Sequence, residues 1–280
     1  MIVYRTRQDL TQHLQTLKNQ GKSIGLVPTM GALHEGHASL VRIASTENEA
    51  IVVTIFVNPT QFNELSDLEK YPRMLEKDLE LLQSMQVDMA FVPSVKEMYP
   101  EEDRRTFDLG NLDKIMEGRY RKGHFTGVAQ IVTKLFELVR PTRAYFGQKD
   151  FQQLVIVRRL AEQMPFHMEI VACPIIREED GLAMSSRNVL LNSEDRKLAP
   201  FINQTMRLAR EKKETMTPDQ VREWVASRFE AHPSIQLEYF EIVEDKKLKS
   251  VRDWSDKGNK FGCIAVVLGG IRLIDNLKFA

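Results

Sequence analysis

The chain has 280 residues, of which 42% are hydrophobic and 28% are charged. This is an ordinary globular composition on a chain long enough to bury a substantial core, so disordered and collagen-like proteins are excluded. Lys plus Arg and Asp plus Glu both number 39, which leaves no excess positive charge to hold a nucleic-acid backbone. A polyanionic ligand would therefore need a local basic patch.

The cysteine pattern and the apolar segments bear on the compartment. Cys173 and Cys263 lack the paired spacing of a zinc site or a disulfide framework, which favours a reducing environment. The N-terminal residues do not form the apolar run of an export signal. The most apolar stretches, 51–57 and 263–268, are far shorter than the roughly 20 residues needed to span a bilayer. We expect a cytoplasmic protein with no membrane span and no nucleic-acid partner.

The first part of the chain alternates strand and helix patterns. Short runs rich in β-branched residues predict buried strands at 24–27, 51–57 and 87–92. Between the first two, residues 37–45 have helical apolar spacing, so this part reads as a βαβ unit. Later segments predict a helix over 128–139, a strand at 144–146, a helix over 151–164 and a strand at 166–172. The alternation predicts an α/β fold with a doubly wound parallel sheet.

After Ile176 the pattern changes to a polar loop, then helices, then a cluster of strands. Thr217 has the features of a helix N-cap, with Pro218 in the first turn. Strands are expected at 236–243, 263–268 and 271–274, and Gly269-Gly270 predicts a hairpin between the last two. We therefore divide the chain into two domains, 1–176 and 177–280.

The segment PTMGALHEGH, residues 28–37, leaves a predicted strand and enters a predicted helix. The N–H groups and positive end of a helix attract anions at such a turn, and Gly31 and Gly36 would let the backbone approach phosphate closely. His34 and His37 could then bond phosphate oxygens and stabilise charge during nucleotidyl transfer. Two alternatives are that these histidines are simple surface or capping residues, or that they hold a metal with Glu35.

Two other loops carry groups suited to phosphate. Residues 184–187, Met-Ser-Ser-Arg, offer two hydroxyls and a guanidinium that could fork across two oxygens, although such a tetrad is common in solvated turns. Residues 147–150, Gly-Gln-Lys-Asp, follow a predicted strand end, where α/β folds bind ligands. Lys149 could reach phosphate there, while an ordinary helix start with Asp150 near the positive end is the other interpretation.

Amide and guanidinium groups elsewhere suggest a site for a small polar acid. Asn58 and Gln61 follow the second predicted strand, and Gln61 with Gln153 could offer amides to hydroxyls and a carboxylate. A proline-induced turn is the alternative for residues 58–62. Arg121 belongs to the basic stretch 119–125, which is ordinarily a solvated loop but could form part of a phosphate site.

Together these segments resemble the pantothenate synthetase (pantoate–β-alanine ligase) family of the HIGH-motif nucleotidyltransferase superfamily. The resemblance spans nearly the whole chain and rests on several motifs in one order. They are PTMGALHEGH at 28–37, FVNPTQF at 56–62, YPR at 71–73, GHFTGV at 123–128, YFGQKDFQQ at 145–153, DGLAMSSRN at 180–188 and RLIDN at 272–276. Two departures from the family pattern are Asn63-Glu64 in place of Gly-Pro and Lys122 in place of a Pro.

The resemblance implies a Rossmann-like N-terminal domain that binds ATP and pantoate, a smaller α+β lid domain, and a homodimer. It also implies a reaction in which the carboxylate of pantoate attacks the α-phosphorus of Mg²⁺-ATP and expels pyrophosphate. The amine of β-alanine would then attack the pantoyl adenylate and release AMP and pantothenate. The resemblance does not identify the magnesium ligands, and Asp78 is one candidate.

The resemblance also assigns residues by position. Those implied in catalysis are His34, His37, Lys149 and Arg187, and those implied in pantoate binding are Gln61, Gln153, Asn58 and Arg121. The implied ATP contacts are Met30, Gly31, Ala32, Leu33, His34, Glu35, Gly36, His37, Gly147, Gln148, Lys149, Asp150, Ile176, Met184, Ser185, Ser186 and Arg187.

Other functions remain open at this point. Another HIGH-type enzyme, such as a cofactor adenylyltransferase or a fragment related to aminoacyl-tRNA synthetases, would carry the same turn, although the zero net charge disfavours tRNA. A non-catalytic nucleotide sensor would bind ATP without transfer. The appearance of AMP and pyrophosphate only when an acid is added separates a ligase from a sensor.

Overall fold

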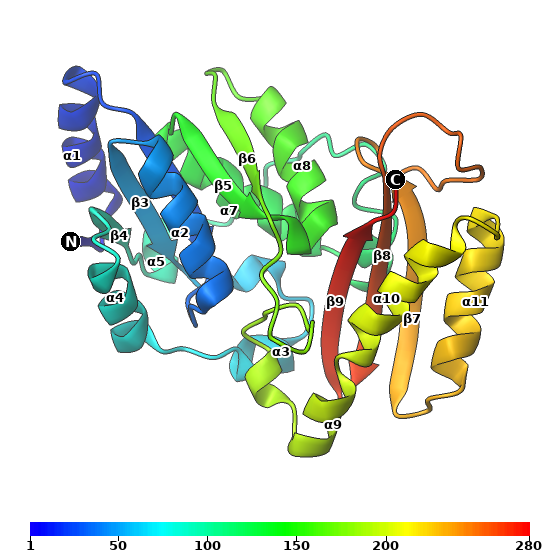
Figure 1. Ribbon diagram of the computed structural model, residues 1–280. Coiled ribbons are helices and arrows are strands. Elements are labelled where there is room, and N and C mark those ends of the chain that lie inside the picture. The colour runs from blue at the N-terminus through cyan, green and yellow to red at the C-terminus, as the bar shows by residue number, and fades with distance from the viewer.

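A computed structural model describes residues 1–280 and contains two sheets (Figure 1). The larger sheet has six strands, all parallel, in the order β1-β4-β3-β2-β5-β6. Its strands are β1 (Ile2–Tyr4), β2 (Ile24–Thr29), β3 (Ala50–Ile55), β4 (Met89–Phe91), β5 (Arg143–Gly147) and β6 (Glu169–Cys173). The predicted doubly wound parallel sheet is confirmed.

Helices cover both faces of this sheet, because successive strand residues point to opposite sides. On β2, Leu26 joins a core that also contains apolar residues of three helices, α1 (Arg7–Asn19), α7 (His124–Val139) and α8 (Phe151–Glu162). The next residue, Val27, joins the core on the other face, formed with α2 (Glu35–Glu47) and α4 (Leu75–Ser84). The all-buried β3 is thus a strand with helices on both sides, as its continuous apolar run predicted.

The direction in which the chain winds changes between β2 and β5. From β2 the chain proceeds through β3 to β4 on one side, and then returns to place β5 and β6 on the other side of β2. Ligands in open α/β sheets bind outside the carboxyl ends of the strands at such a switch point. The segments that follow β2 and β5 are residues 30–37 and 148–150, so the two motifs from the sequence meet at this edge.

The C-terminal part contains a three-stranded antiparallel sheet, β7-β8-β9, with two helices packed against it (Figure 1). Its elements are α9 (Ser193–Leu198), α10 (Phe201–Lys212), α11 (Pro218–Glu230), β7 (Ile235–Glu244), β8 (Lys260–Leu268) and β9 (Ile271–Lys278). Thr217 caps α11 by accepting the Gln220 N–H, and Gly269 and Gly270, both with positive φ, form the predicted β8–β9 hairpin. The second predicted unit is therefore an α+β structure.

The other face of this small sheet packs against the large domain. Phe261 of β8 stacks on Phe151 of α8 with ring centroids 4.3 Å apart, and Val243, Leu248 and Cys263 belong to the same core as α7 and α8. The connection between the sheets runs from Cys173 to α9 and contains an antiparallel bridge between Arg177 and Ala183. The boundary at 176/177 falls within this connection and stays a prediction.

The remaining elements are short helical segments in the connections. They are η1 (Pro59–Gln61), α3 (Leu65–Lys70), α5 (Val95–Met98), α6 (Glu117–Tyr120), η2 (Gln148–Asp150) and η3 (Asn188–Leu190). The sequence pattern did not predict β1, α1 or α4, and it placed the other strand limits of the large sheet within about three residues of those observed. None of the helices combines the length and hydropathy that crossing a membrane requires.

Candidate active site

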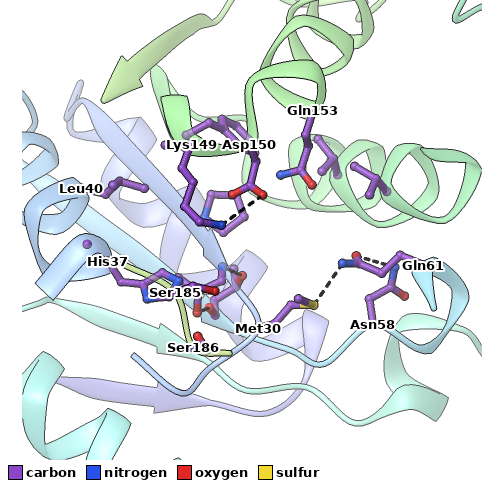
Figure 2. A pocket seen from close by; sticks show the side chains of 18 of the residues that line it. Met30, His37, Leu40, Asn58, Gln61, Lys149, Asp150, Gln153, Ser185 and Ser186 are labelled. Atoms are coloured by element: carbon purple, nitrogen blue, oxygen red, sulfur yellow. Dashed lines mark hydrogen bonds and ion pairs between the residues drawn. The ribbon is translucent and has the colours of Figure 1, made fainter. Parts of the chain in front are cut away.

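A cavity of about 230 Å³ opens at the carboxyl ends of β2 and β5 (Figure 2). It brings together residues from distant parts of the sequence. The predicted site residues that line it are Met30, His34, Gly36, His37, Asn58, Gln61, Arg121, Gly147, Lys149, Asp150, Gln153, Ile176, Met184, Ser185, Ser186 and Arg187. The structure therefore places the nucleotide motifs and the acid-binding candidates in one cavity.

Five predicted ATP contacts do not line the cavity: Gly31, Ala32, Leu33, Glu35 and Gln148. The exposed Glu35 pairs with Arg42 at 2.6 Å on the outer side of α2, so it is not placed as a third metal ligand beside the histidines. No group of three or more His, Cys, Asp or Glu side chains is arranged to hold a metal ion. The other four residues belong to the segments after β2 and β5 that carry the cavity residues.

The turn before α2 is held by a buried carboxylate from another helix. Asp78 of α4 is 2% exposed, and its two oxygens accept the N–H groups of Ala32 at 2.9 Å and Leu33 at 2.7 Å. Gly31 and Ala32 both have positive φ, of 81° and 49°, and a Cβ on Gly31 would lie 2.9 Å from the Asp78 carboxylate. Asp78 thus fixes a strained turn, and both of its oxygens are engaged there rather than in the cavity.

His34 and His37 are oriented by backbone N–H groups at the start of α2. His34 is the N-cap residue, and its Nδ1 accepts the Gly36 N–H at 3.1 Å. The Nδ1 of His37 accepts the His34 N–H at 3.3 Å, and the two ring centroids lie 4.1 Å apart. A neutral imidazole that accepts at Nδ1 carries its proton on Nε2. Each ring is therefore a neutral donor through Nε2–H.

The protonation state of these rings follows from their surroundings. Burial lowers the pKa of His34 to about 4, and the nearby Lys149 acts in the same direction. Burial, then His34 and Lys149, lower the pKa of His37 to about 3. Both rings are neutral at pH 7, so they stabilise an anion as hydrogen-bond donors rather than as cations.

Gly36 has a structural role in addition to the close approach of phosphate that was expected of it, which stays a prediction. A Cβ on Gly36 would lie 2.7 Å from the His34 ring. Gly36 is therefore required so that the His34 ring can fold back onto the Gly36 N–H.

The loop that carries Lys149 is fixed by the C-terminal sheet. The Asn276 amide of β9 donates to the carbonyls of Gln148 at 2.8 Å and Lys149 at 2.9 Å. Lys149 lies 3.9 Å from the Asp150 carboxylate, and both side chains point into the cavity (Figure 2). The cation is thus only loosely paired.

The 184–187 loop closes the cavity from the C-terminal side. Ser186 Oγ donates to the Ala32 carbonyl at 3.1 Å, which attaches this loop to the histidine turn. Arg187 pairs with Asp67 at 2.9 Å and lies over the Tyr71 ring, 5.7 Å from its centroid. The two hydroxyls and the guanidinium of this loop therefore line the cavity.

The acid-binding candidates form a buried polar group beside Met30. Asn58 donates through Nδ2 to Gln61 Oε1 at 3.2 Å and to the Gly127 carbonyl at 3.1 Å, and Gln61 donates to Met30 Sδ at 3.1 Å. Gln153 projects from α8 into the same space (Figure 2). A ligand here would meet two amides at the side of the cavity away from the histidines.

The charge of the cavity wall is positive although the chain is neutral overall. Arg121, Lys149 and Arg187 line it, and Asp150 is the one carboxylate among its lining residues. With the histidines neutral, the wall carries a net positive charge that suits phosphates or a carboxylate. The local basic patch that the composition required is present.

Comparison with known proteins identifies the family. A family model described as pantoate-beta-alanine ligase matches residues 2–278. The chain belongs to this family. It is therefore an enzyme of the ligase class, and the family resemblance seen in the sequence is confirmed.

Relatives of this ligase match over its whole length. Pantothenate synthetase of Bacteroides fragilis is 54% identical over 279 residues, which are 100% of this chain and 99% of the relative. The corresponding protein of Porphyromonas gingivalis is 48% identical over 279 residues, with the same coverage. The similarity therefore includes both the parallel sheet and the C-terminal sheet.

Solved structures agree. Pantothenate synthetase from Thermus thermophilus has a TM-score of 0.93 and 42% identity, covering 100% of this chain and 99% of that one. A pantoate-beta-alanine ligase from Francisella tularensis, described as complexed with beta-gamma ATP and β-alanine, has a TM-score of 0.83 and 34% identity, covering 100% and 98% of the two chains. The ligase fold is shared throughout.

Three residues of this ligase hold site segments in place without having been assigned that role from the sequence: Asp78, which was considered only as a magnesium ligand, Asn276, and His124, whose Nδ1 bonds the Gln61 carbonyl at 2.7 Å. Asp78 and the Ala32 N–H that it binds are 46 residues apart, and no local pattern connects them. Asn276 and His124 belong to the RLIDN and GHFTGV motifs, which were quoted without a role for either residue. Motif membership was the available signal for these two.

Proposed function

We propose that this ligase condenses pantoate with β-alanine in two steps within the cavity at the ends of β2 and β5. In the first step a carboxylate oxygen of pantoate bonds to the α-phosphorus of ATP, and the bond to the bridging oxygen breaks to release pyrophosphate. In the second step the neutral amine of β-alanine bonds to the acyl carbon and loses a proton, and AMP leaves. The adenylate makes this step favourable because AMP is a better leaving group than hydroxide.

The geometry of the two histidines carries this proposal. Two Nε2–H donors stand at the N-terminus of the 13-residue helix α2, in the same cavity as the cations Lys149 and Arg187. Neutral donors held by backbone N–H groups do not need to reorganise as negative charge develops on the departing pyrophosphate. A helix N-terminus adds a further favourable potential for phosphate.

The opposite side of the cavity suits the acid. Gln61 and Gln153 supply amides for the hydroxyls and carboxylate of pantoate, Asn58 holds Gln61, and Arg121 supplies a cation. The Francisella ligase is described with ATP and β-alanine bound, which supports these two molecules as substrates here. We infer that ATP occupies the side of the cavity with the histidines and that pantoate occupies the opposite side, beside Gln61 and Gln153.

Mg²⁺ is part of the proposal as the partner of ATP. The cavity offers it one carboxylate, Asp150, and a site of this kind holds Mg²⁺ through one or two carboxylates together with substrate phosphates. Bound there, the ion would neutralise phosphate charge. Asp78 is a less suitable ligand because its oxygens are bonded to Ala32 and Leu33.

We also propose that residues 1–176 bind ATP and pantoate while residues 177–280 act as a lid. The 184–187 loop reaches across to the Ala32 carbonyl, which supports a closing role. A lid would exclude water from the adenylate, which water would otherwise hydrolyse. The family resemblance further supports a cytoplasmic homodimer, and sedimentation equilibrium tests the dimer.

The decisive experiment measures AMP and pyrophosphate against a panel of acids and amines, with and without chelation of Mg²⁺. We expect pyrophosphate release to require pantoate and Mg²⁺, and amide formation to require β-alanine. His37→Ala should lose most acid-dependent ATP–pyrophosphate exchange, whereas His167→Ala, on an exposed loop, should retain it. Full exchange in the His37→Ala variant would refute the assignment, and ATP binding without acid-dependent turnover would identify a sensor.

A further inference from the structure

Arg121 is a half-buried cation whose nearest hydrogen-bond partner is neutral. Its side chain is 18% exposed and lines the cavity. Its Nη1 lies 3.1 Å from His124 Nε2, and His124 Nδ1 lies 2.7 Å from the Gln61 carbonyl. Since a carbonyl can only accept, Nδ1 carries the proton and Nε2 accepts from Arg121. His124 thus orients Arg121 and connects it to the Gln61 loop without neutralising its charge.

The nearest carboxylate to Arg121 belongs to Glu117, which is engaged elsewhere. Glu117 is 6% exposed, and Arg272 of β9 donates to its two oxygens at 2.6 and 2.8 Å. The Tyr239 hydroxyl of β7 donates to it at 2.7 Å. The distance from Glu117 to Arg121 Nη1 is 4.0 Å. Both oxygens of the Glu117 carboxylate therefore accept hydrogen bonds from residues of the C-terminal sheet.

The other cavity cations differ from Arg121 in this respect. Arg187 has its own carboxylate, Asp67, at 2.9 Å, and the carboxylate 3.9 Å from Lys149, Asp150, forms no other ion pair, whereas Glu117 is held by Arg272. Burial lowers the pKa of Arg121 to about 10 although Glu117 opposes the shift, and Arg187 and Arg272 lower it further. Arg121 is thus the cavity cation whose charge is least balanced by a neighbouring carboxylate.

We propose that Arg272 is a positioning residue that acts through Glu117. By holding the Glu117 carboxylate, Arg272 keeps it 4.0 Å from the Arg121 guanidinium, which stays directed to the carboxylate of the acid substrate. This inference rests on the proposed function, in which Arg121 contacts pantoate. It also gives the C-terminal sheet a part in acid recognition, because β9 acts on Arg121 through this carboxylate.

Removal of Arg272 would leave the Glu117 carboxylate without its closest cation. A buried carboxylate that loses its cation is costly, and Arg121 is the other cation within 4.0 Å of it. Glu117 would then draw Arg121 toward itself and away from the substrate. Removal of the Glu117 charge at the same time should release Arg121 again.

The test is a double-mutant cycle on Arg272→Met and Glu117→Gln. Arg272→Met should raise the KM for pantoate about tenfold or more, the equivalent of one charge-assisted hydrogen bond, with a much smaller effect on the KM for ATP. Glu117→Gln should leave the KM for pantoate nearly unchanged. The double variant should return it to within about threefold of the unmodified enzyme, a coupling that non-interacting sites do not show.

Arg222→Met is the matched control. Arg222 also lies in the C-terminal part and pairs with Asp219 at 2.7 Å and Glu241 at 3.3 Å, but it does not line the cavity. Its loss should lower the melting temperature and leave the KM for pantoate unchanged. If Arg272→Met does not fold, Tyr239→Phe removes one donor to Glu117, and it should raise the KM for pantoate by a smaller factor.

The outcomes separate this inference from the proposed function. An unmodified enzyme with no pantoate-dependent pyrophosphate release refutes the proposed function itself. With that activity present, an unchanged KM in Arg272→Met, or in Tyr239→Phe where it is needed, overturns the role of Arg272. A raised KM that Glu117→Gln does not restore also overturns it, because it indicates a purely structural contact between the two sheets.

Discussion

Replacement of Asp78 with alanine tests how the turn that carries the histidines is held. The substitution leaves two buried N–H groups, those of Ala32 and Leu33, without their acceptor. Each such loss costs about 1–3 kcal/mol, so the free energy of unfolding should fall by about 2–6 kcal/mol. The left-handed backbone of Ala32, with φ of 49°, costs about 1–2 kcal/mol, which the two bonds offset. Without them the turn should relax and move His34.

The assay combines denaturant unfolding with pantoate-dependent pyrophosphate exchange. We expect Asp78→Ala to lower the melting temperature by roughly 4 °C or more and the exchange rate by about 100-fold, since a small displacement of a catalytic group has that effect. Asp78→Asn keeps one acceptor, so its melting temperature and exchange rate should lie between those of Asp78→Ala and the unmodified enzyme. The control is Asp88→Ala, because exposed Asp88 accepts the Ile51 N–H at 2.8 Å away from the cavity. Unchanged stability and exchange in Asp78→Ala would refute the reasoning.

Two further predictions concern the histidines. Gly36→Ala should reduce exchange at least tenfold with little loss of fold, because its Cβ would lie 2.7 Å from the His34 ring, and a crystal structure should show that ring displaced. Burial lowers the pKa values of His34 and His124 to about 4 and that of His37 to about 3, so between pH 6.5 and about 4 the unfolded chain binds more protons. The free energy of unfolding should therefore fall from about pH 7 to pH 5, and less steeply in His37→Gln.

The sequence predicted those features that depend on local periodicity. The β-branched run around Val52 and the helical spacing after His37 indicated a βαβ unit, which the structure contains as β2, α2 and β3. The motifs also follow strand ends, and parallel strands align these ends at one edge of the sheet. This is why His37 and Lys149, more than 100 residues apart, could be expected to lie together.

The sequence did not predict side-chain pairings that depend on tertiary packing. Glu117 lies on a four-residue helix, and its partner Arg272 is 155 residues away on another sheet. Glu117 has no local pattern that distinguishes it from a solvated charge, and Arg272 was included in the RLIDN motif without a role. The strand β1 was missed for a related reason, because three residues beginning at Ile2 are too few to show a period, and their strand is defined by pairing with the distant β4.

The two sequence interpretations of the histidines, helix caps or catalytic groups, are compatible in this structure. A surface imidazole with a free Nδ1 could carry its proton on either nitrogen and turn freely about its side-chain bonds. By accepting the Gly36 N–H, His34 is limited to one tautomer and one orientation, and the His34 N–H does the same for His37. The capping bonds leave Nε2–H as the donor of each ring. The bonds that begin α2 thus also prepare the two donors that the proposed adenylation requires.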